Sequence, residues 1–221
     1  MSSERQQRVP LSRERVLAAA RDLCDAEGLA GLSMRRIAER LGVEAMSLYH
    51  HVDGKDALLD ALADEVLGQV DLPGAAQPWR AAMAARAGSA RQVLGAHPWA
   101  IGLVESRSAP GPALLRHHDA VLANLLGNGF PHRLAMHAFC VLDAYVYGFV
   151  VTEQHLPFDL VGGQAEYAAG LVRAAGDQPH LTAVLVELRG DPGYRFADEF
   201  EHGLVIVLDG LQARLDTGAA S

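Results

Sequence analysis

Several features that mark secreted, metal-binding or redox proteins are scarce in this sequence. It has two cysteines, Cys24 and Cys140, and neither belongs to a CxxC pair of the kind that binds zinc or carries out thiol exchange. We expect both to be small buried apolar residues on helices. The first ten residues, MSSERQQRVP, lack the apolar core of a signal peptide. These absences predict a cytoplasmic protein that needs no metal and no cofactor.

Long apolar runs are also missing. A membrane-spanning helix needs roughly 18 apolar residues with few or no charges. The longest candidate, Ala135 to Val151, is interrupted by His137, Asp143 and Gly148. We therefore expect no membrane partner, although a hydrophobic content of 50% is ample for a folded core.

Positive charge is scarce overall but unevenly placed. The net charge is −8, which by itself argues against a nucleic-acid partner. Residues 1–55, however, hold 9 Lys plus Arg against 8 Asp plus Glu, whereas the rest of the chain holds 10 against 19. This asymmetry predicts a DNA-facing N-terminal part attached to an acidic body.

Apolar residues at helical spacing divide residues 11–70 into four helices, behind a flexible arm formed by residues 1–10. Ser12 and Ser33 are the predicted N-caps of the first two helices, and Gly28 and Gly42 end them. The predicted ranges are Ser12–Glu27, Ser33–Leu41, Ala45–His51 and Lys55–Val70.

The segment PGAAQP, from Pro73 to Pro78, is the predicted domain boundary because it contains two prolines and a glycine. Beyond it no segment alternates with the period of two that indicates a strand, so the fold class is all-α. We expect residues 79–216 to form a domain for ligand binding and dimerisation. Its predicted helices are Trp79–Gly95, Trp99–Ser106, Pro112–Leu126, Pro131–His155, Gln164–Ala175, Leu181–Arg189 and Tyr194–Leu215, with a loop at Leu156–Gly163.

Residues 35–52 fit a helix-turn-helix, in which two helices cross at a steep angle over a tight turn. The first helix needs a small residue at the crossing, which Ala38 supplies. The turn needs a residue that tolerates positive φ, which Gly42 supplies. Val43 and Leu48 then point the second helix back into the core. Such a unit places the start of its second helix in the DNA major groove.

Three roles follow for the residues of this motif. Ala45, Met46 and Ser47 face base edges, where apolar side chains contact thymine methyl groups and a hydroxyl forms hydrogen bonds. Donors nearby bind phosphate oxygens and fix the register. The N-terminal turn after Ser33 offers free N–H groups to a phosphate. The predicted phosphate-side residues are Ser33, Arg35, Arg36, Tyr49, His51 and Lys55.

Each of these side chains has an ordinary structural explanation when it is taken alone. Tyr49 can cap a small core, His50 and His51 can be surface residues, and the pair Arg35–Arg36 can be a solvated face. The convergence of several donors on one face of a motif with the correct turn favours DNA binding. His50 is given no definite role.

The run GLAGLSMRRIAERLGVEAMSLYHHVDGKDALLDAL resembles the DNA-binding domain of the TetR family of bacterial repressors. The resemblance covers about Leu11 to Leu67 and implies an all-α homodimer that binds double-stranded operator DNA. It aligns Arg35, Ser47, Tyr49, His51 and Lys55 with DNA-contacting positions. Ala45 and Met46 fall at base-reading positions that hold other residues in tetracycline repressors, so the operator sequence is expected to differ. The resemblance also implies a dimer interface on the helices Pro131–His155 and Tyr194–Leu215.

A small-molecule effector would bind among the helices of the second domain, where bulky aromatic residues alternate with polar ones. A packed core has the same composition, so both interpretations remain open. The candidate lining residues are Trp99, Leu103, Arg107, Leu115, His118, Tyr145, Phe149 and Thr152.

Tetracycline repressors hold their drug as a magnesium complex through a histidine, and this sequence aligns Val104 at that position. The resemblance therefore implies a different effector, apolar or aromatic and free of metal. The adjacent His117 and His118 point about 100° apart on a helix and chelate one ion poorly.

Three other hypotheses about the function of the protein remain. An enzyme would have to use the cluster of Glu153, His155 and Asp159, which a charged loop explains better. The others are a DNA-binding protein without a ligand, and an activator.

Overall fold

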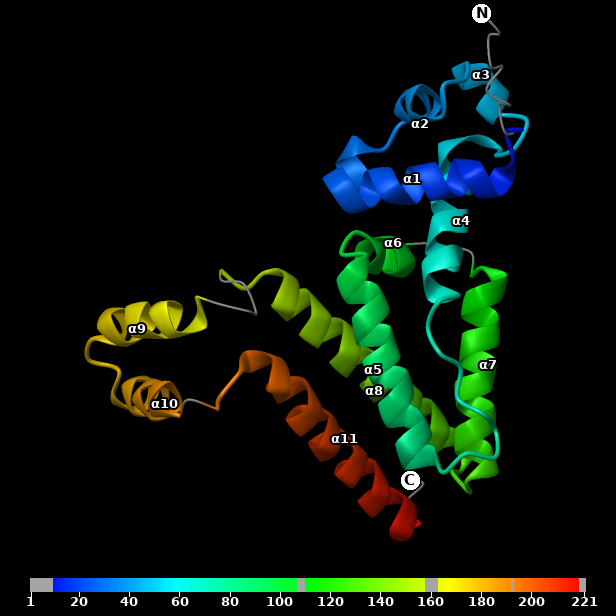
Figure 1. Cartoon of the computed structure of the whole chain (residues 1–221). Coiled ribbons are helices and arrows are strands. Elements are labelled where there is room, and N and C mark those ends of the chain that lie inside the picture. The colour runs from blue at the N-terminus through cyan, green and yellow to red at the C-terminus, as the bar shows by residue number, and fades with distance from the viewer. Residues whose placement is uncertain (1–9, 107–109, 158–162, 192, 219–221) are drawn as a thin grey trace, which may run out of the picture. The chain divides into compact units, whose positions relative to one another are not determined.

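The computed structural model describes residues 10–106, 110–157, 163–191 and 193–218 (Figure 1). Within these ranges the chain forms eleven α-helices and two short 3-10 helices, and no strand. The predicted all-α class is confirmed. Two compact units are present: a head unit formed by Met1–Leu72 with Gln92–Ala120, and a bundle unit formed by Pro73–Arg91 with Val121–Ser221. Residues 92–120, which follow the predicted boundary, thus fold with the N-terminal helices.

The first helices of the head unit begin and end where local chemistry requires. The side-chain oxygen of Ser12 accepts a hydrogen bond of 3.3 Å from the backbone N–H of Arg15, and Ser33 accepts one of the same length from Arg36. Each serine thereby satisfies one of the unpaired donors of a helix N-terminus. These helices are α1 (Arg13–Glu27), a 3-10 turn η1 (Leu29–Gly31), α2 (Met34–Leu41), α3 (Ala45–Leu48) and α4 (Gly54–Leu67).

A small core holds these helices together. It consists of apolar side chains that recur at helical spacing on α1 and α4, with single contributions from the two helices between them. Helix α4 also packs against α6 (Ala100–Ser106). Helix α4 ends three residues before the predicted Val70, and residues 68–70 continue as a turn. The fully buried core residues include Val16, Ala20, Ile37, Leu48, Leu58, Leu62 and Val66.

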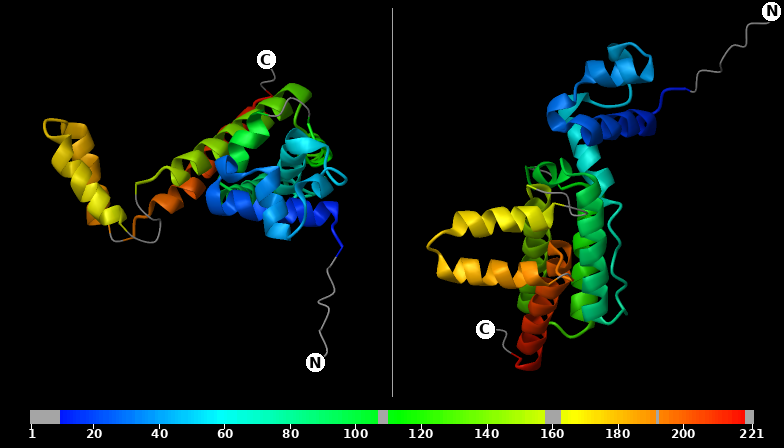
Figure 2. Two further views of the ribbon diagram at one scale, coloured as in Figure 1. Left: turned by 90° about the horizontal axis from the view of Figure 1, so that it is seen from above. Right: turned by 60° about the vertical axis from the view of Figure 1, so that its left-hand side comes forward.

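The bundle unit is built around two long helices, α8 (His132–Gln154) and α11 (Glu199–Asp216), which pack along each other (Figure 2). Phe200, Leu204, Leu208 and Leu211 form the buried side of α11. Tyr145 on α8 lies so close to Gly203 that a Cβ there would be 3.0 Å from its ring, so a larger residue would separate the two helices.

The remaining elements of the bundle unit are a hairpin and parts of two helices. Helices α9 (Gln164–Ala175) and α10 (Pro179–Gly190) pack against each other, and no residue of α10 is buried. Helix α5 (Trp79–Ala96) and helix α7 (Pro112–Gly127) each contribute to both units.

Helix α11 begins five residues later than the predicted start at Tyr194, after a 3-10 turn at Phe196–Asp198. The side chain of Gln164 explains the difference. Its Nε2 donates to the carbonyl of Tyr194 (3.2 Å), and its Oε1 accepts from the N–H of Phe196 (3.0 Å). Because the first residue of α9 bonds this backbone, the segment does not continue the helix.

Helix α8 is long and apolar enough to cross a membrane by length and composition, although only 33% of its most apolar window is buried. Its carboxylate Asp143 forms an ion pair with Arg86, whose side chain is only 2% exposed. A charge in the middle of the helix is therefore held inside the protein. Cys140 on the same helix is exposed, so the prediction that both cysteines are buried is wrong for this residue; only Cys24 is buried.

Candidate nucleic-acid interface

The turn between α2 and α3 has the geometry that a helix-turn-helix needs. Gly42 adopts a left-handed conformation with φ 66° and ψ 37°. The N–H of Val43 then bonds the carbonyl of Ala38 (3.0 Å), and the N–H of Gly42 bonds that of Glu39 (3.3 Å). This pair of bonds is a Schellman motif, which satisfies the last carbonyls of α2 and turns the chain sharply. The roles predicted for Ala38 and Gly42 fit this geometry.

Helix α3 presents one side to the core and the other to solvent. Leu48 is completely buried and anchors the helix. Met46 is 73% exposed and Tyr49 is 47% exposed, although both are large residues that normally bury part of their surface. Ala45 and Ser47 are partly exposed. A methionine held outward at the start of such a helix is unusual for a core residue, because its burial would be favourable by about 1.5–3 kcal/mol.

The polar residues predicted around this helix differ in how available they are. Lys55 on the first turn of α4 is exposed, and His51 is half-buried. The side chain of Arg35 is 85% exposed, and its Nε lies 2.8 Å from Glu39 one turn further along α2. An exposed pair of this kind is worth well under about 1 kcal/mol, so Arg35 can exchange its partner for a phosphate. His50 is exposed.

Arg36 is held in a different environment. Its two terminal nitrogens bond the two carboxylate oxygens of Glu27, and one of them also donates to the carbonyl of Gly31 (3.0 Å). This bonding lowers the pKa of the Glu27 carboxyl and raises that of Arg36. The guanidinium therefore joins the end of α1, the 3-10 turn and α2. Glu27 was not predicted from the sequence, since a partner nine residues away lies outside any helical spacing.

Four of the predicted effector-lining residues lie in the head unit. Trp99 is buried, and its Nε1 donates to Oδ1 of Asp25 on α1 (2.6 Å). Leu103 is buried, His118 is half-buried and Leu115 is 54% exposed. Arg107 lies outside the described residues.

Three others lie in the bundle unit, and two of them belong to one aromatic cluster. The rings of Tyr145 and Phe149 lie 6.1 Å apart, and both contact Phe200. The Tyr145 hydroxyl donates to the carbonyl of Phe200 (2.7 Å), and burial raises its pKa. Thr152 is exposed, and its hydroxyl donates to the carbonyl of Gly148 (2.8 Å).

Arg91 completes this cluster. Its guanidinium lies 5.1 Å from the centre of the Phe149 ring and 4.6 Å from that of Phe200, within the range of cation–π attraction. It also pairs with Glu153, with Nε 2.9 Å from one carboxylate oxygen. Phe196 stacks on Phe149 at 5.4 Å. The aromatic residues predicted as a pocket are thus packed on each other around a paired cation.

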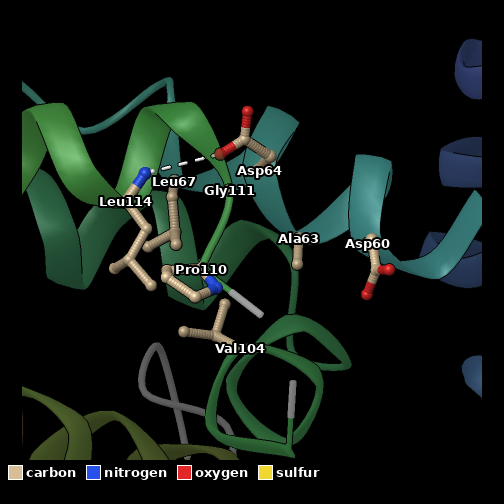
Figure 3. A pocket seen from close by; sticks show the side chains of 8 residues that line it. All are labelled: Asp60, Ala63, Asp64, Leu67, Val104, Pro110, Gly111 and Leu114. Atoms are coloured by element: carbon tan, nitrogen blue, oxygen red, sulfur yellow. Dashed lines mark hydrogen bonds between the residues drawn. The ribbon is translucent and has the colours of Figure 1, made fainter. Parts of the chain in front are cut away.

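A small pocket lies in the head unit between α4, α6 and the start of α7 (Figure 3). Val104 forms one of its walls. From the sequence, this residue aligns with the magnesium-binding histidine of tetracycline repressors. Asp60 and Asp64 bring carboxylates to it, and the other walls are mainly apolar. The lining residues are Asp60, Ala63, Asp64, Leu67, Val104, Pro110, Gly111 and Leu114.

Among the described residues, no group of three His, Cys, Asp or Glu side chains has the arrangement of a metal site. Two members of the cluster weighed as an enzyme site are engaged in other contacts. Glu153 is bonded to Arg91, and Nδ1 of His155 lies 2.7 Å from the carbonyl of Val151. Asp159 lies outside the described residues.

The geometry of α2 and α3 thus defines a helix-turn-helix protein of the DNA-binding class. Comparison with known proteins agrees with this. Residues 16–62 match the model of bacterial regulatory proteins of the tetR family, and residues 72–215 match that of the tetracyclin repressor-like C-terminal domain. The chain therefore belongs to the TetR family of transcriptional regulators, which are DNA-binding proteins and not enzymes.

Individual relatives match over nearly the whole chain. An HTH-type transcriptional regulator of Saccharopolyspora erythraea is 34% identical over 207 residues, which cover 92% of this chain and 85% of the relative. The class A tetracycline repressor of transposon 1721, from Escherichia coli, is 34% identical over 202 residues, covering 90% and 89%. The structure of Streptomyces coelicolor ActR in complex with actinorhodin matches with a TM-score of 0.76 and 28% identity, covering 93% of this chain and 97% of that one.

Proposed function

We propose that this chain is a homodimeric, cytoplasmic repressor that binds operator DNA through α3 and leaves it when a small molecule binds the C-terminal domain. The observation that carries the proposal is the outward presentation of Met46 and Tyr49 on a helix whose Leu48 is fully buried. Two relatives with the word repressor in their names support repression over activation.

We assign the DNA-contacting roles according to how exposed each side chain is. Ala45, Met46 and Ser47 read base edges, because they occupy the solvent-facing start of α3. Arg35, Tyr49, His51, Lys55 and the N-terminus of α2 behind Ser33 bind phosphates and set the register. Arg36 contributes by holding α2 in place through Glu27, and it contacts DNA only by giving up part of that bonding.

The proposed dimer uses the exposed sides of α8 and α11. Met136, Val141 and Val151 on α8 are each at least 40% exposed, and Ile206 on α11 is 72% exposed. Small exposed residues, Ala144 and Gly148, lie on the same side of α8 and allow a second helix to approach. Pairing two copies would bury this apolar surface in a four-helix interface.

The proposed effector is apolar or aromatic and binds without a metal. ActR was crystallised with actinorhodin, and Val104 cannot coordinate a magnesium ion as a histidine does. The lining residues predicted from the sequence stay a prediction, and in this structure two of them, Tyr145 and Phe149, pack on Phe200. The predicted set is Trp99, Leu103, Arg107, Leu115, His118, Tyr145, Phe149 and Thr152. Binding of the effector and of DNA must oppose each other reciprocally, with a coupling of about 1–3 kcal/mol.

Selection from a random duplex library tests the DNA half of the proposal. The expected product is a palindrome with two half-sites, bound with an affinity that falls steeply with salt. Lys55→Ala should weaken binding to all duplexes alike, and it should reduce the slope of log affinity against log salt concentration by about 1. Met46→Ala should instead change which bases are preferred. Recovery of no duplex by the wild-type protein would refute the function. Identical profiles for the two variants would refute the division of labour.

The effector half is tested with actinorhodin as the probe, measured as displacement of the selected duplex and as thermal stabilisation. The same assay with tetracycline plus magnesium is the comparison. Release by actinorhodin without magnesium supports the proposal. If only the magnesium–tetracycline complex releases the duplex, the proposal that the effector binds without a metal is contradicted. A broad screen in which nothing stabilises the protein favours a regulator that needs no ligand.

A further inference from the structure

Helix α7 begins without an N-cap of its own. Its first residue, Pro112, has no N–H, and the residue before it, Gly111, has no side chain. The first donors of the helix are therefore the N–H groups of Ala113 and Leu114, and neither has an acceptor within the helix.

The acceptor for both comes from α4. Oδ1 of Asp64 lies 2.6 Å from the nitrogen of Ala113. It also lies 3.4 Å from the nitrogen of Leu114, as Figure 3 shows. The approach depends on Gly111, because a Cβ there would overlap the carboxylate and lie 2.7 Å from its Cγ. A negative charge at this position is also favoured by the dipole of α7. Asp64 thus caps another helix, 49 residues further along the chain.

The next residue on α4 makes a contact in another direction. Glu65 forms an ion pair with Arg21 of α1, and both side chains are about 30% exposed. Two consecutive carboxylates therefore tie the same turn of α4 to two elements: Glu65 to the first helix of the DNA-binding head, and Asp64 to the start of α7. Helix α4 is the segment that directly follows the DNA-reading helix α3.

We propose that Asp64 is a positioning residue that fixes the direction of α4 by capping α7, and thereby sets the separation of the two reading helices in the dimer. The inference rests on the proposed function, since it requires a dimer on a two-part operator. Half-sites one turn apart require reading helices about 34–36 Å apart, so freedom of α4 would broaden the range of spacings that the dimer accepts. An effector that displaces the start of α7 would act on this bond.

The test compares duplexes carrying the selected half-sites with zero to four base pairs inserted or removed between them. Wild-type protein should show one sharply preferred spacing. Asp64→Ala should lose about twofold to thirtyfold in affinity for that spacing, the range that corresponds to the loss of a helix N-cap. It should bind the other spacings nearly as well. Asp64→Asn should restore the preference, because asparagine is an equally good N-cap.

Two further variants separate positioning from folding. Gly111→Ala keeps the carboxylate but pushes it off the helix, so it should broaden the spacing profile as Asp64→Ala does. Asp60→Ala removes the same charge from the same helix and pocket, one turn earlier, and should keep the sharp preference. Thermal unfolding of each variant establishes whether it is folded. If Asp64→Ala does not fold, the spacing profiles of Asp64→Asn and Gly111→Ala test the inference in its place.

A measurement without DNA completes the test. A spin label at Arg40→Cys in a Cys140→Ala background reports the distance between the two heads of the dimer. This distribution should widen in Asp64→Ala and stay narrow in Asp60→Ala. Unchanged spacing profiles and distances in Asp64→Ala and Gly111→Ala would overturn the inference while leaving the proposed function standing. Failure of the wild-type protein to bind any duplex would instead refute the proposed function, and this inference with it.

Discussion

Asp25 and Trp99 are joined by a hydrogen bond of 2.6 Å from the indole Nε1 to the carboxylate Oδ1. The same oxygen lies 2.7 Å from Nδ1 of His97. One carboxylate on α1 therefore holds two residues of the turn that precedes α6. This contact ties the turn before α6 to α1 within the same compact unit.

Asp25→Ala should destabilise the head unit by about 1–3 kcal/mol, because it leaves the N–H of a buried tryptophan without its acceptor. Urea unfolding measures the loss. Asp22→Ala is the matched control on the same helix, since Asp22 takes part in an exposed pair with Arg40 and should cost less than about 1 kcal/mol. Equal losses in the two variants would show that the Trp99 bond contributes nothing.

Gly42→Ala should destabilise the protein by about 1–2 kcal/mol, because alanine must adopt the left-handed conformation that glycine takes at φ 66°. DNA affinity should fall with it, since the turn aims α3. Gly88→Ala in α5 should instead raise the free energy of unfolding by about 0.5–1 kcal/mol, because alanine is more stable than glycine inside a helix. A Cβ there meets no atom within 4 Å. Thermal unfolding of the pair checks both signs, and a stabilising Gly42→Ala would contradict the turn geometry.

The contribution of Glu27 should depend on pH. Hydrogen bonds from Arg36 hold the pKa of its carboxyl below the ordinary value, so the folded state favours the charged form. The stabilisation is then complete above the ordinary glutamate pKa of about 4.3 and disappears as the pH falls through the lowered pKa.

Urea midpoints of wild-type protein and Glu27→Gln should accordingly differ at neutral pH and converge in acid. Glu44→Gln makes the same chemical change at an exposed position of the same unit and is the matched control. A difference between wild type and Glu27→Gln that grows as the pH falls below the ordinary glutamate pKa would rule out this pairing as its source.

The two thiols should react very differently. Burial raises the pKa of the Cys24 thiol to about 11, and only the thiolate is the reactive form. In Cys140→Ala, a thiol reagent at pH 8 should therefore modify the folded protein slowly and the urea-unfolded protein at once. Cys24→Ala leaves the exposed Cys140 for comparison. Rapid labelling of folded Cys140→Ala would show that α1 opens readily.

Ile206→Arg should convert the dimer to a monomer, because it places a charge in the apolar face of α11 that a second copy would cover. Sedimentation equilibrium measures the mass. Leu72→Arg changes a residue that is also exposed, at 52%, but lies outside α8 and α11, and it should remain dimeric. A dimeric Ile206→Arg protein would show that the subunits meet elsewhere.

The sequence predicted the helices well where their ends are set by neighbouring residues. Ser12, Ser33 and Gly42 cap helices through contacts within four residues, so α1 and α2 lie where expected. Contacts between distant residues were beyond such reasoning. Gln164 delays the start of α11 from 30 residues away. Asp64 caps α7, and Glu27 engages Arg36; neither spacing has a local signature.

The same limit applies to the candidate residues. The outward side of α3 followed from the positions of Val43 and Leu48, which are local. Whether Tyr145 and Phe149 line a cavity or pack on Phe200 depends on α11, more than 50 residues away. The periodicity of α8 marked Cys140 as apolar but could not say which side of the helix would be covered.

The exposure of Met46 also bears on how such a regulator can change its target. The Schellman turn and Leu48 fix where α3 points, while Met46 is 73% exposed to solvent. Under the proposed function, stability and sequence preference thus depend on different positions within a few residues of each other. A duplicated copy could acquire a new operator by substitution at this one position without repacking its core, so descendants can diverge in target while they keep one architecture.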